Sequence, residues 1–301
     1  MKKVCRVCGN NNFSKTFYPD IYFNKKYFTF YKCNNCKSFN LFPIPTEDDF
    51  ALMYGETDHS YLNKIDSKIE FDFKYPFGSH QRYQLKFLKE ISHLLKGKTL
   101  LDYACGSGFY MKYANNLGAK VIGIEFGKDF VELLKKKTDL EIYTYEEFKE
   151  KYEQIKFDFI HLGHILEHVP NPMRLLQELS KFANEDTLFI IDGPLERNFC
   201  LSRFYIDLGS ILKSKKYIEI QPQHLTLTNA KSQLMFFEKV GLKKERFKVV
   251  EQFFPLPNKF SNSLFSNISF IIAFLSIILS SFIPNMGNVF HFRGKFRSDI
   301  L

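Results

Sequence analysis

The hydrophobic pattern of this chain is most regular between residues 98 and 125. An apolar run of strand length covers 99–103, helical spacing covers 109–117, and a second short apolar run covers 121–125. Gly106 and Gly108 stand between the first run and the helix, where glycine allows a tight turn that other residues avoid. The pattern predicts a strand, a glycine turn, a helix and a second strand.

The same alternation extends over most of the chain. We expect helices at 81–96, 129–137, 146–152, 175–182 and 229–241, and strands at 140–145, 156–162, 188–192, 247–254 and 287–297. Strands that alternate with helices indicate an α/β fold with a doubly wound, parallel sheet, which binds ligands at the carboxyl ends of its strands.

The glycine turn predicts a nucleotide-like cofactor, because Glu125 ends the second strand, where a carboxylate can accept hydrogen bonds from ribose hydroxyls. The third glycine of the dinucleotide pattern is replaced by Met111. Asp102, at the tip of the first strand, would repel a pyrophosphate but suits a ligand with an amino group. S-adenosylmethionine therefore fits better than a dinucleotide. A ligand-free strand–helix–strand unit is the plain alternative.

Two segments carry a family resemblance. Residues 101–108, Leu-Asp-Tyr-Ala-Cys-Gly-Ser-Gly, resemble motif I of the class I S-adenosylmethionine-dependent methyltransferases, with Ala104 where the family usually has glycine. Residues 157–172 resemble the segment after strand four of the same enzymes. The resemblance implies a Rossmann-like sheet with an antiparallel last strand. It also implies a cofactor site made of Asp102, Ala104, Gly106, Gly108, Glu125, Phe126, Tyr145, Glu146, Leu162 and Gly163.

The second segment also contains a rival motif. His164, Glu167 and His168 satisfy the H-x-x-E-H pattern of inverted zinc peptidases. Those ligands need a continuous helix, whereas here a strand precedes them and prolines follow. We therefore expect Glu167 and His168 to turn and cap the chain, and His164, nearest the strand end, to be a candidate catalytic base.

Four cysteines near the N-terminus predict a structural zinc site. They form two C-x-x-C pairs separated by 24 residues: Cys5, Cys8, Cys33 and Cys36. This spacing is typical of a zinc ribbon, in which four thiolates close a tetrahedron around the metal. Disulfides are the weaker alternative. Cys105 and Cys200 are expected to pack in the core.

The ribbon and the segment behind it resemble the N-terminus of zinc-ribbon methyltransferases that act on nucleotide-linked sugars. We expect a zinc ribbon at 1–45, a linker or lid at 46–80, and a methyltransferase domain at 81–301 with insertions at 195–225 and 255–285. The first insertion is expected to cover the acceptor pocket. His224, near its end, resembles the histidine of that group and is the second candidate base, with a capping or packing role as the alternative.

Residues 264–283 are apolar and without charge, so their length alone would allow a membrane span. Six serines or asparagines dilute the run, and a strand is expected to follow it. We therefore expect a helix that is buried or touches a membrane surface rather than a span.

Composition and charge exclude few of the possible binding partners. The net charge of +9 suits a nucleotide, a nucleic acid or an anionic membrane, but the basic residues are scattered. We expect a cytoplasmic S-adenosylmethionine-dependent enzyme, with association to a membrane surface as an alternative location. Its acceptor is expected to be a small molecule, most simply an activated or glycan-linked sugar that is methylated on oxygen or carbon. RNA methylation is the alternative, disfavoured because the ribbon lacks a clear basic, aromatic stripe.

Overall fold

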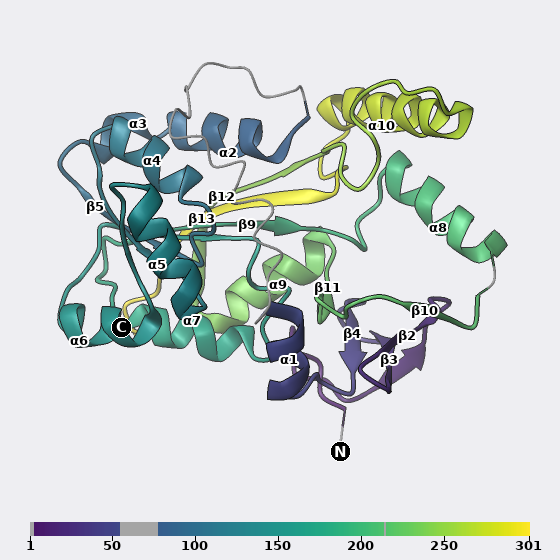
Figure 1. Ribbon diagram of the computed structural model, residues 1–301, viewed down its shortest axis with the longest axis horizontal. Helices are drawn as coiled ribbons and strands as arrows, with labels where there is room; N and C mark the ends of the chain where they lie inside the picture. The colour runs from purple at the N-terminus through teal and green to yellow at the C-terminus, as the bar shows by residue number, and fades with distance from the viewer. Residues whose placement is uncertain (1–2, 55–77, 214) are drawn as a thin grey trace.

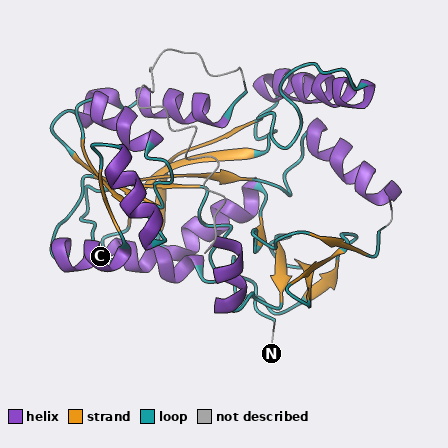
Figure 2. Ribbon diagram, viewed as in Figure 1, coloured by secondary structure: helices purple, strands orange, loops and turns teal. Residues whose placement is uncertain are grey.

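The computed structural model describes residues 3–54, 78–213 and 215–301. In these ranges a large sheet has helices on both faces, and a smaller sheet lies beside it near the N-terminus (Figures 1 and 2). Most of the segment expected to be a linker or lid falls at 55–77, outside the described residues.

The large sheet has seven strands within the described ranges, in the order β12-β13-β9-β8-β5-β6-β7. Their bounds are β5 Thr99–Tyr103, β6 Lys120–Ile124, β7 Glu141–Tyr143, β8 Phe159–Gly163, β9 Leu188–Pro194, β12 Leu242–Val250 and β13 Val289–Phe296. The strands from β5 to β9 are parallel, and β13 runs antiparallel to both β9 and β12. The predicted mixed α/β sheet is confirmed.

Helices cover the two faces of this sheet because each presents an apolar stripe to it. One buried cluster gathers α2 His80–Lys89, α3 Ser92–Leu95, α4 Phe109–Asn116 and α5 Lys128–Lys137. The other gathers α6 Tyr145–Tyr152, α7 Pro172–Ser180 and α9 Ala230–Val240. The expectation of one continuous helix at 81–96 is wrong. Ile91 leaves helical geometry, with φ −111° and ψ 12°, and packs into the core together with Leu95.

The small sheet combines the N-terminal segment with the first insertion. Its strands β1 Phe13–Lys15, β2 Asp20–Phe23, β3 Lys26–Cys33 and β4 Phe39–Phe42 are followed by α1 Glu47–Tyr54. From the insertion, β10 Tyr217–Glu219 pairs parallel with β2, and β11 Thr226–Leu227 pairs antiparallel with β4. Leu225 packs with Phe28 and Leu41 in one buried cluster. The sequence pattern did not predict that β10 and β11 pair with the N-terminal strands.

Two further helices, α8 Leu201–Lys213 and α10 Leu264–Phe282, lie side by side at one end of the molecule (Figure 1). The inward face of α10 includes Ser269, Ala273, Ser276 and Ile277, and Ser276 donates a hydrogen bond to buried Glu251. Only 22% of the apolar stretch of this helix is buried inside the protein. The expected helix is present, but it is largely exposed, because small residues and Ile277 face the protein while most of its other large apolar residues face solvent.

Candidate functional site

The glycine turn after β5 is held by the carboxylate that ends β6. Glu125 accepts one backbone N–H from Gly106 and one from Phe126, each at 2.6 Å. Burial raises the pKa of Glu125. The turn uses left-handed backbone at three positions: Ala104 has φ +58°, Gly106 +54° and Gly108 +74°. The left-handed φ at Ala104 gives a physical reason why related sequences place glycine there.

The two glycines of the turn differ in their surroundings. A Cβ on Gly108 would lie 2.3 Å from Leu140 Cδ1, so the Leu140 side chain would have to shift, and the left-handed φ would strain any other residue there. A Cβ on Gly106 would meet nothing within 4 Å. The backbone at Gly106 therefore borders open space, as a cradle for a bound group requires.

Aromatic rings lie beside this cradle. Tyr103 makes edge contacts with Phe126 and Tyr145, at centroid distances of 5.6 and 6.5 Å. Phe126 is 48% exposed, and Glu146 is exposed in the first turn of α6. Leu162 is fully buried in β8, so its side chain belongs to the core and only its backbone can face a ligand.

A buried chain of charged groups links the carboxyl ends of β5, β8 and β9. Its central residue, His161, was not predicted from the sequence. His161 Nδ1 lies 2.6 Å from Asp102 Oδ1, and His161 Nε2 lies 3.1 Å from Asp192 Oδ1. Gln84 Nε2 donates to Asp192 Oδ2 at 3.1 Å, beside Gly163. Burial alone would lower the pKa of His161, but the two carboxylates outweigh it and raise the pKa to about 9. The sequence feature that could have indicated this role is the presence of a histidine within an otherwise apolar strand.

His164 follows β8 and lies between this chain and a cavity. Its backbone has φ +53°, and its Nε2 lies 3.4 Å from Asp192 Oδ2. The ring packs edge-on against His80 at 4.2 Å. Burial, reinforced by His80, lowers the pKa of His164 to about 3. The ring is therefore neutral at physiological pH and binds a proton only weakly.

His224 pairs with a carboxylate from the same insertion. Its Nδ1 lies 2.8 Å from Glu196 Oε2, and its ring makes an edge contact with His168 at 4.7 Å. Burial opposes protonation, but Glu196 outweighs it and raises the pKa of His224 to about 9. His224 therefore carries a positive charge at neutral pH.

Glu167 and His168 do not cap the following helix. The N-cap of α7 is Asn171, whose side chain accepts the N–H of Arg174. Glu167 and His168 instead line the cavity together with His224. Burial raises the pKa of Glu167 to about 7 and lowers the pKa of His168 to about 4. The capping expectation for these two residues is thus corrected.

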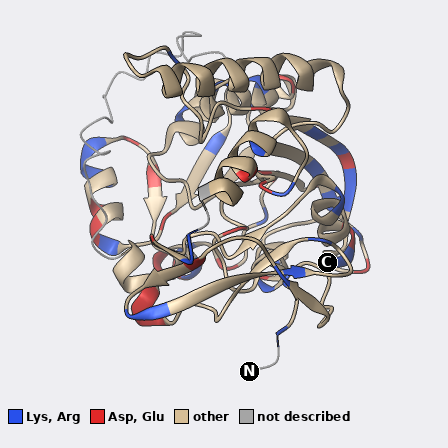
Figure 3. Ribbon diagram, turned by 90° about the vertical axis from the view of Figure 1, so that its right-hand side faces the viewer, with Lys and Arg blue, Asp and Glu red and all other residues tan. Residues whose placement is uncertain are grey.

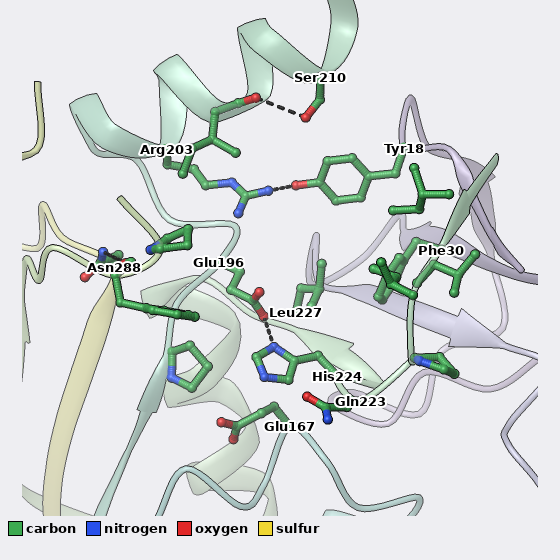
Figure 4. Close-up of a pocket in the computed structure, with 18 of the residues that line it drawn as sticks. Tyr18, Phe30, Glu167, Glu196, Arg203, Ser210, Gln223, His224, Leu227 and Asn288 are labelled. Carbon is green, nitrogen blue, oxygen red and sulfur yellow. Dashed lines mark hydrogen bonds and ion pairs between the residues drawn. The ribbon is translucent and has the colours of Figure 1, made fainter. Parts of the chain in front are cut away.

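The cavity has a volume of about 700 Å³ and lies between the strand ends of the large sheet, the small sheet and α8 (Figure 4). Its lining is mainly apolar and aromatic, from residues such as Ile21, Phe30, Ile206, Ile218, Leu227, Phe254 and Val289. Arg203 and Lys215 also line it. The Arg203 guanidinium contacts both Tyr18 of the small sheet and Asp207 of α8, and so fixes one wall against the other.

The four N-terminal cysteines converge as their spacing predicts. Cys5 Sγ lies 3.5 Å from Cys36 Sγ, Cys8 Sγ lies 3.5 Å from Cys33 Sγ, and all four sulfurs are within 4.8 Å of one another. A tetrahedron with zinc–sulfur bonds of about 2.3 Å has edges of about 3.8 Å, so the donor set fits zinc. Arg6 anchors this knuckle by donating to the carbonyls of Leu225 and Leu41.

Comparison with known proteins agrees with this geometry. Residues 77–246 match the family described as "Methyltransferase domain". The ubiquinone biosynthesis O-methyltransferase of Glaesserella parasuis is 30% identical over 130 residues, which are 40% of this chain and 55% of that protein. The demethylmenaquinone methyltransferase of Oceanobacillus iheyensis is 30% identical over 134 residues, 41% of this chain and 56% of that protein. The chain spans about half the length of these curated relatives.

Solved structures of similar fold include an S-adenosylmethionine-dependent methyltransferase from Archaeoglobus fulgidus, with 17% identity, a TM-score of 0.46, and coverage of 71% of this chain and 94% of that one. The family match covers more than half of the 301 residues and includes the glycine turn, β5 to β9 and α9. On this match, the chain belongs to the methyltransferase domain family, whose cofactor is S-adenosylmethionine.

Proposed function

We propose that the enzyme methylates a small molecule bound in the 700 Å³ cavity. The observation that supports this most is the position of the cavity, which meets the carboxyl ends of the strands at His164. His164 follows β8, the direct neighbour of the strand β5 that leads into the glycine turn. The volume of the cavity lies in the usual range for small-ligand sites, about 300 to 1,000 Å³. A methyl group leaving a sulfonium at the strand ends would thus reach an acceptor inside the protein, away from water.

The cofactor is proposed to lie over the glycine turn. Asp102, buried at the tip of β5, would attract its amino group, and the Gly106 backbone would approach its main body. Glu125 would accept hydrogen bonds from the ribose, because each carboxylate oxygen has a second lone pair besides the one that takes a backbone N–H. Phe126 and Tyr145 offer aromatic surface for the adenine.

The acceptor is proposed to have an apolar body and a hydroxyl group. The apolar and aromatic lining favours such a molecule, and two relatives carry names from ubiquinone and menaquinone synthesis. An activated or glycan-linked sugar is the second candidate, because Arg203 and Lys215 line the cavity and could hold a diphosphate. RNA is disfavoured, since basic and acidic residues are interspersed over the face in Figure 3 rather than gathered in a stripe.

Neither histidine predicted as a base is suited to the role at neutral pH. His224 is already protonated, with a pKa of about 9, and His164 binds a proton too weakly, with a pKa of about 3. We therefore propose that both residues position the acceptor and that its hydroxyl is acidified by another route.

Two accessory features complete the proposal. The four cysteines are proposed to hold a structural zinc ion, which fixes the small sheet that walls the cavity. The exposed apolar face of α8 and α10 is proposed to touch an anionic membrane surface. Leu208, Leu275 and Phe282 are exposed on it, while Lys216 and Lys259 flank the two helices with positive charge.

Cofactor binding is tested by calorimetric titration with S-adenosylmethionine. Glu125→Ala should weaken binding by about 1 to 3 kcal/mol, the scale of a hydrogen bond to a charged group. Glu150→Ala, an exposed carboxylate on α6, serves as the matched control and should bind normally. Equal affinities in the two variants would remove the ribose assignment.

The acceptor class is tested by methyl transfer to three kinds of substrate: an apolar phenol or hydroquinone, a nucleotide-linked sugar, and structured RNA. We expect turnover on a small acceptor that changes little between low and moderate salt. An RNA held through many phosphates would lose orders of magnitude in affinity over the same range. Tight RNA binding with a steep salt dependence would overturn the small-molecule proposal.

A further inference from the structure

Three side chains meet at the floor of the cavity with the chemistry of a metal site. One ligand atom from each of Glu167, His168 and His224 lies within 4.8 Å of the others. Glu167 is 6% exposed, and its Oε1 has no hydrogen-bond partner among the described residues. His168 Nε2 lies 3.7 Å from that oxygen. A buried carboxylate oxygen without a partner is costly, so its position facing ring nitrogens needs an explanation.

The outer contacts of the two histidines supply that explanation. His168 Nδ1 lies 3.1 Å from the carbonyl oxygen of Gln223 and 3.2 Å from the hydroxyl of Tyr54. The carbonyl can only accept, so a bond to it places the proton on Nδ1 and leaves the lone pair on Nε2. His224 Nδ1 is likewise occupied by Glu196, at 2.8 Å. Histidines that bind metals almost always use their second nitrogen in this way, with a carboxylate or a backbone carbonyl as partner. A cation would bind His224 through Nε2 and displace the proton from that nitrogen. Figure 4 shows Glu196, His224 and Glu167 in this order across the cavity floor.

We propose that Glu167, His168 and His224 bind one divalent transition-metal cation, of the Mn²⁺, Fe²⁺, Co²⁺ or Zn²⁺ class, whose open positions face the cavity. Imidazole and carboxylate donors suit these ions, and three protein ligands leave room for a substrate oxygen. Bond lengths of about 2.1 Å give a tetrahedron with edges of about 3.4 Å, so ligand atoms that lie within 4.8 Å of one another need to approach by at most about 1.4 Å. This site is separate from the four cysteines, which are coordinatively closed.

The cation would supply the acidification that neither histidine provides. A hydroxyl bound to a divalent ion loses its proton far more readily than a free one. The proton leaves to solvent and the acceptor oxygen forms a bond to the methyl carbon. The carbon–sulfur bond breaks at the same time, and its electron pair stays on sulfur, so the sulfonium becomes a neutral thioether. This chemical role rests on the proposed methyl transfer, whereas metal binding itself does not.

A second cluster lies close by and does not carry the same inference. His80, His164 and Asp192 also place ligand atoms within 4.8 Å. However, Asp192 already accepts from His161 and Gln84, so its charge is compensated within the protein. In the described part of the chain, Glu167 Oε1 accepts no hydrogen bond, and His164 Nδ1 and His168 Nε2 both lie 3.7 Å from it.

Mn²⁺ binding followed by electron paramagnetic resonance tests the site, because Mn²⁺ prefers oxygen and nitrogen ligands and leaves zinc on the cysteines. We expect one Mn²⁺ per zinc-loaded chain. His224→Ala and Glu167→Gln should weaken binding more than about 100-fold, and Glu196→Gln about 10- to 100-fold, the range for partners of metal ligands. His93→Ala, an exposed histidine on α3, is the control and should bind normally.

Absence of Mn²⁺ binding to the wild-type enzyme, or equal binding by His224→Ala, would overturn the proposal. Should His224→Ala fail to fold, Glu196→Gln decides the question, because it leaves all three ligands in place, and an unchanged affinity there also overturns it. Mn²⁺ binding without methyl transfer would count against the proposed function alone. Transfer without Mn²⁺ binding would count against the metal site alone.

Discussion

At the scale of single residues, the most unusual environment belongs to His161. Its ring is buried between Asp102 and Asp192 and stacks on Tyr110 at a centroid distance of 3.5 Å. Replacing the ring by an apolar residue would leave two buried carboxylates without their partner, which costs several kcal/mol in comparable pairs. Because Asp102 is also the residue proposed to attract the cofactor's amino group, His161 positions a cofactor contact without touching the cofactor.

The charge of His161 makes stability depend on pH. Its pKa is about 9 in the folded protein, above the ordinary 6.5. Its contribution is therefore fully present below pH about 6.5 and is lost as the pH rises through about 9, a loss of roughly 3 kcal/mol. Denaturant unfolding from pH 6 to 10 should show this loss in the wild type, and His161→Gln should lack that part of it. His224 titrates in the same pH range and contributes equally to both proteins. The difference between the two profiles of unfolding free energy against pH therefore gives the contribution of His161 alone. Parallel profiles would contradict the buried cationic histidine.

At the scale of elements, α10 presents its large apolar residues to solvent and its serines to the protein. Ile271 is 45%, Leu275 46% and Phe282 80% exposed. A water-facing helix normally has the opposite pattern. The helix is 19 residues long and could span a bilayer by length, but it packs against α8 and the strand β12, and in the sequence it stands between the paired strands β12 and β13. An exposed apolar face of this extent indicates an interaction surface.

We expect the wild-type enzyme to sediment with anionic phospholipid vesicles. The triple variant Ile271→Ser, Leu275→Ser and Phe282→Ser should reduce partitioning by at least about tenfold, because each buried apolar side chain contributes about 1.5 to 3 kcal/mol. Ile155→Ser, at an exposed apolar residue beyond α6, is the matched control. Wild-type protein that stays in the supernatant, or a triple variant that partitions normally, would contradict the membrane contact.

At the scale of the whole molecule, the N-terminal sheet and the methyltransferase sheet share the cavity. Tyr18 and Phe30 reach it from one side, and His164 and Pro194 from the other. Lys239 of α9 donates to the carbonyl of Cys8, which ties the cysteine knuckle to the large domain. The small sheet therefore forms one wall of the cavity that is proposed to bind the acceptor.

Loss of the proposed zinc ion should therefore weaken binding of the acceptor but not binding of S-adenosylmethionine. Cys33→Ser should release the zinc measured by mass spectrometry and lower the melting temperature of the small sheet, because closed thiolate sites supply folding energy. Acceptor binding should fall while S-adenosylmethionine still binds, since the glycine turn lies in the large sheet. Cys200→Ser, a buried cysteine outside the cluster, should retain its zinc. A metal-free wild type with an intact small sheet would refute the zinc site.

The sequence by itself determined the features that depend on neighbours along the chain. Apolar periodicity predicted the strands and helices of the large sheet, the glycines predicted the turn after β5, and the C-x-x-C spacing predicted that the four cysteines converge. Each of these patterns follows from local backbone geometry, which repeats every 2 or about 3.6 residues.

Only the tertiary structure decided the features that join distant segments. The contact of His161 with Asp102 spans 59 residues, and that of His224 with Glu196 spans 28. The addition of β10 and β11 to the N-terminal sheet and the inward serines of α10 also needed the folded chain. The periodicity of the sequence does not predict which buried histidine contacts which carboxylate. These contacts depend on tertiary packing, and they determine the protonation state of the histidines.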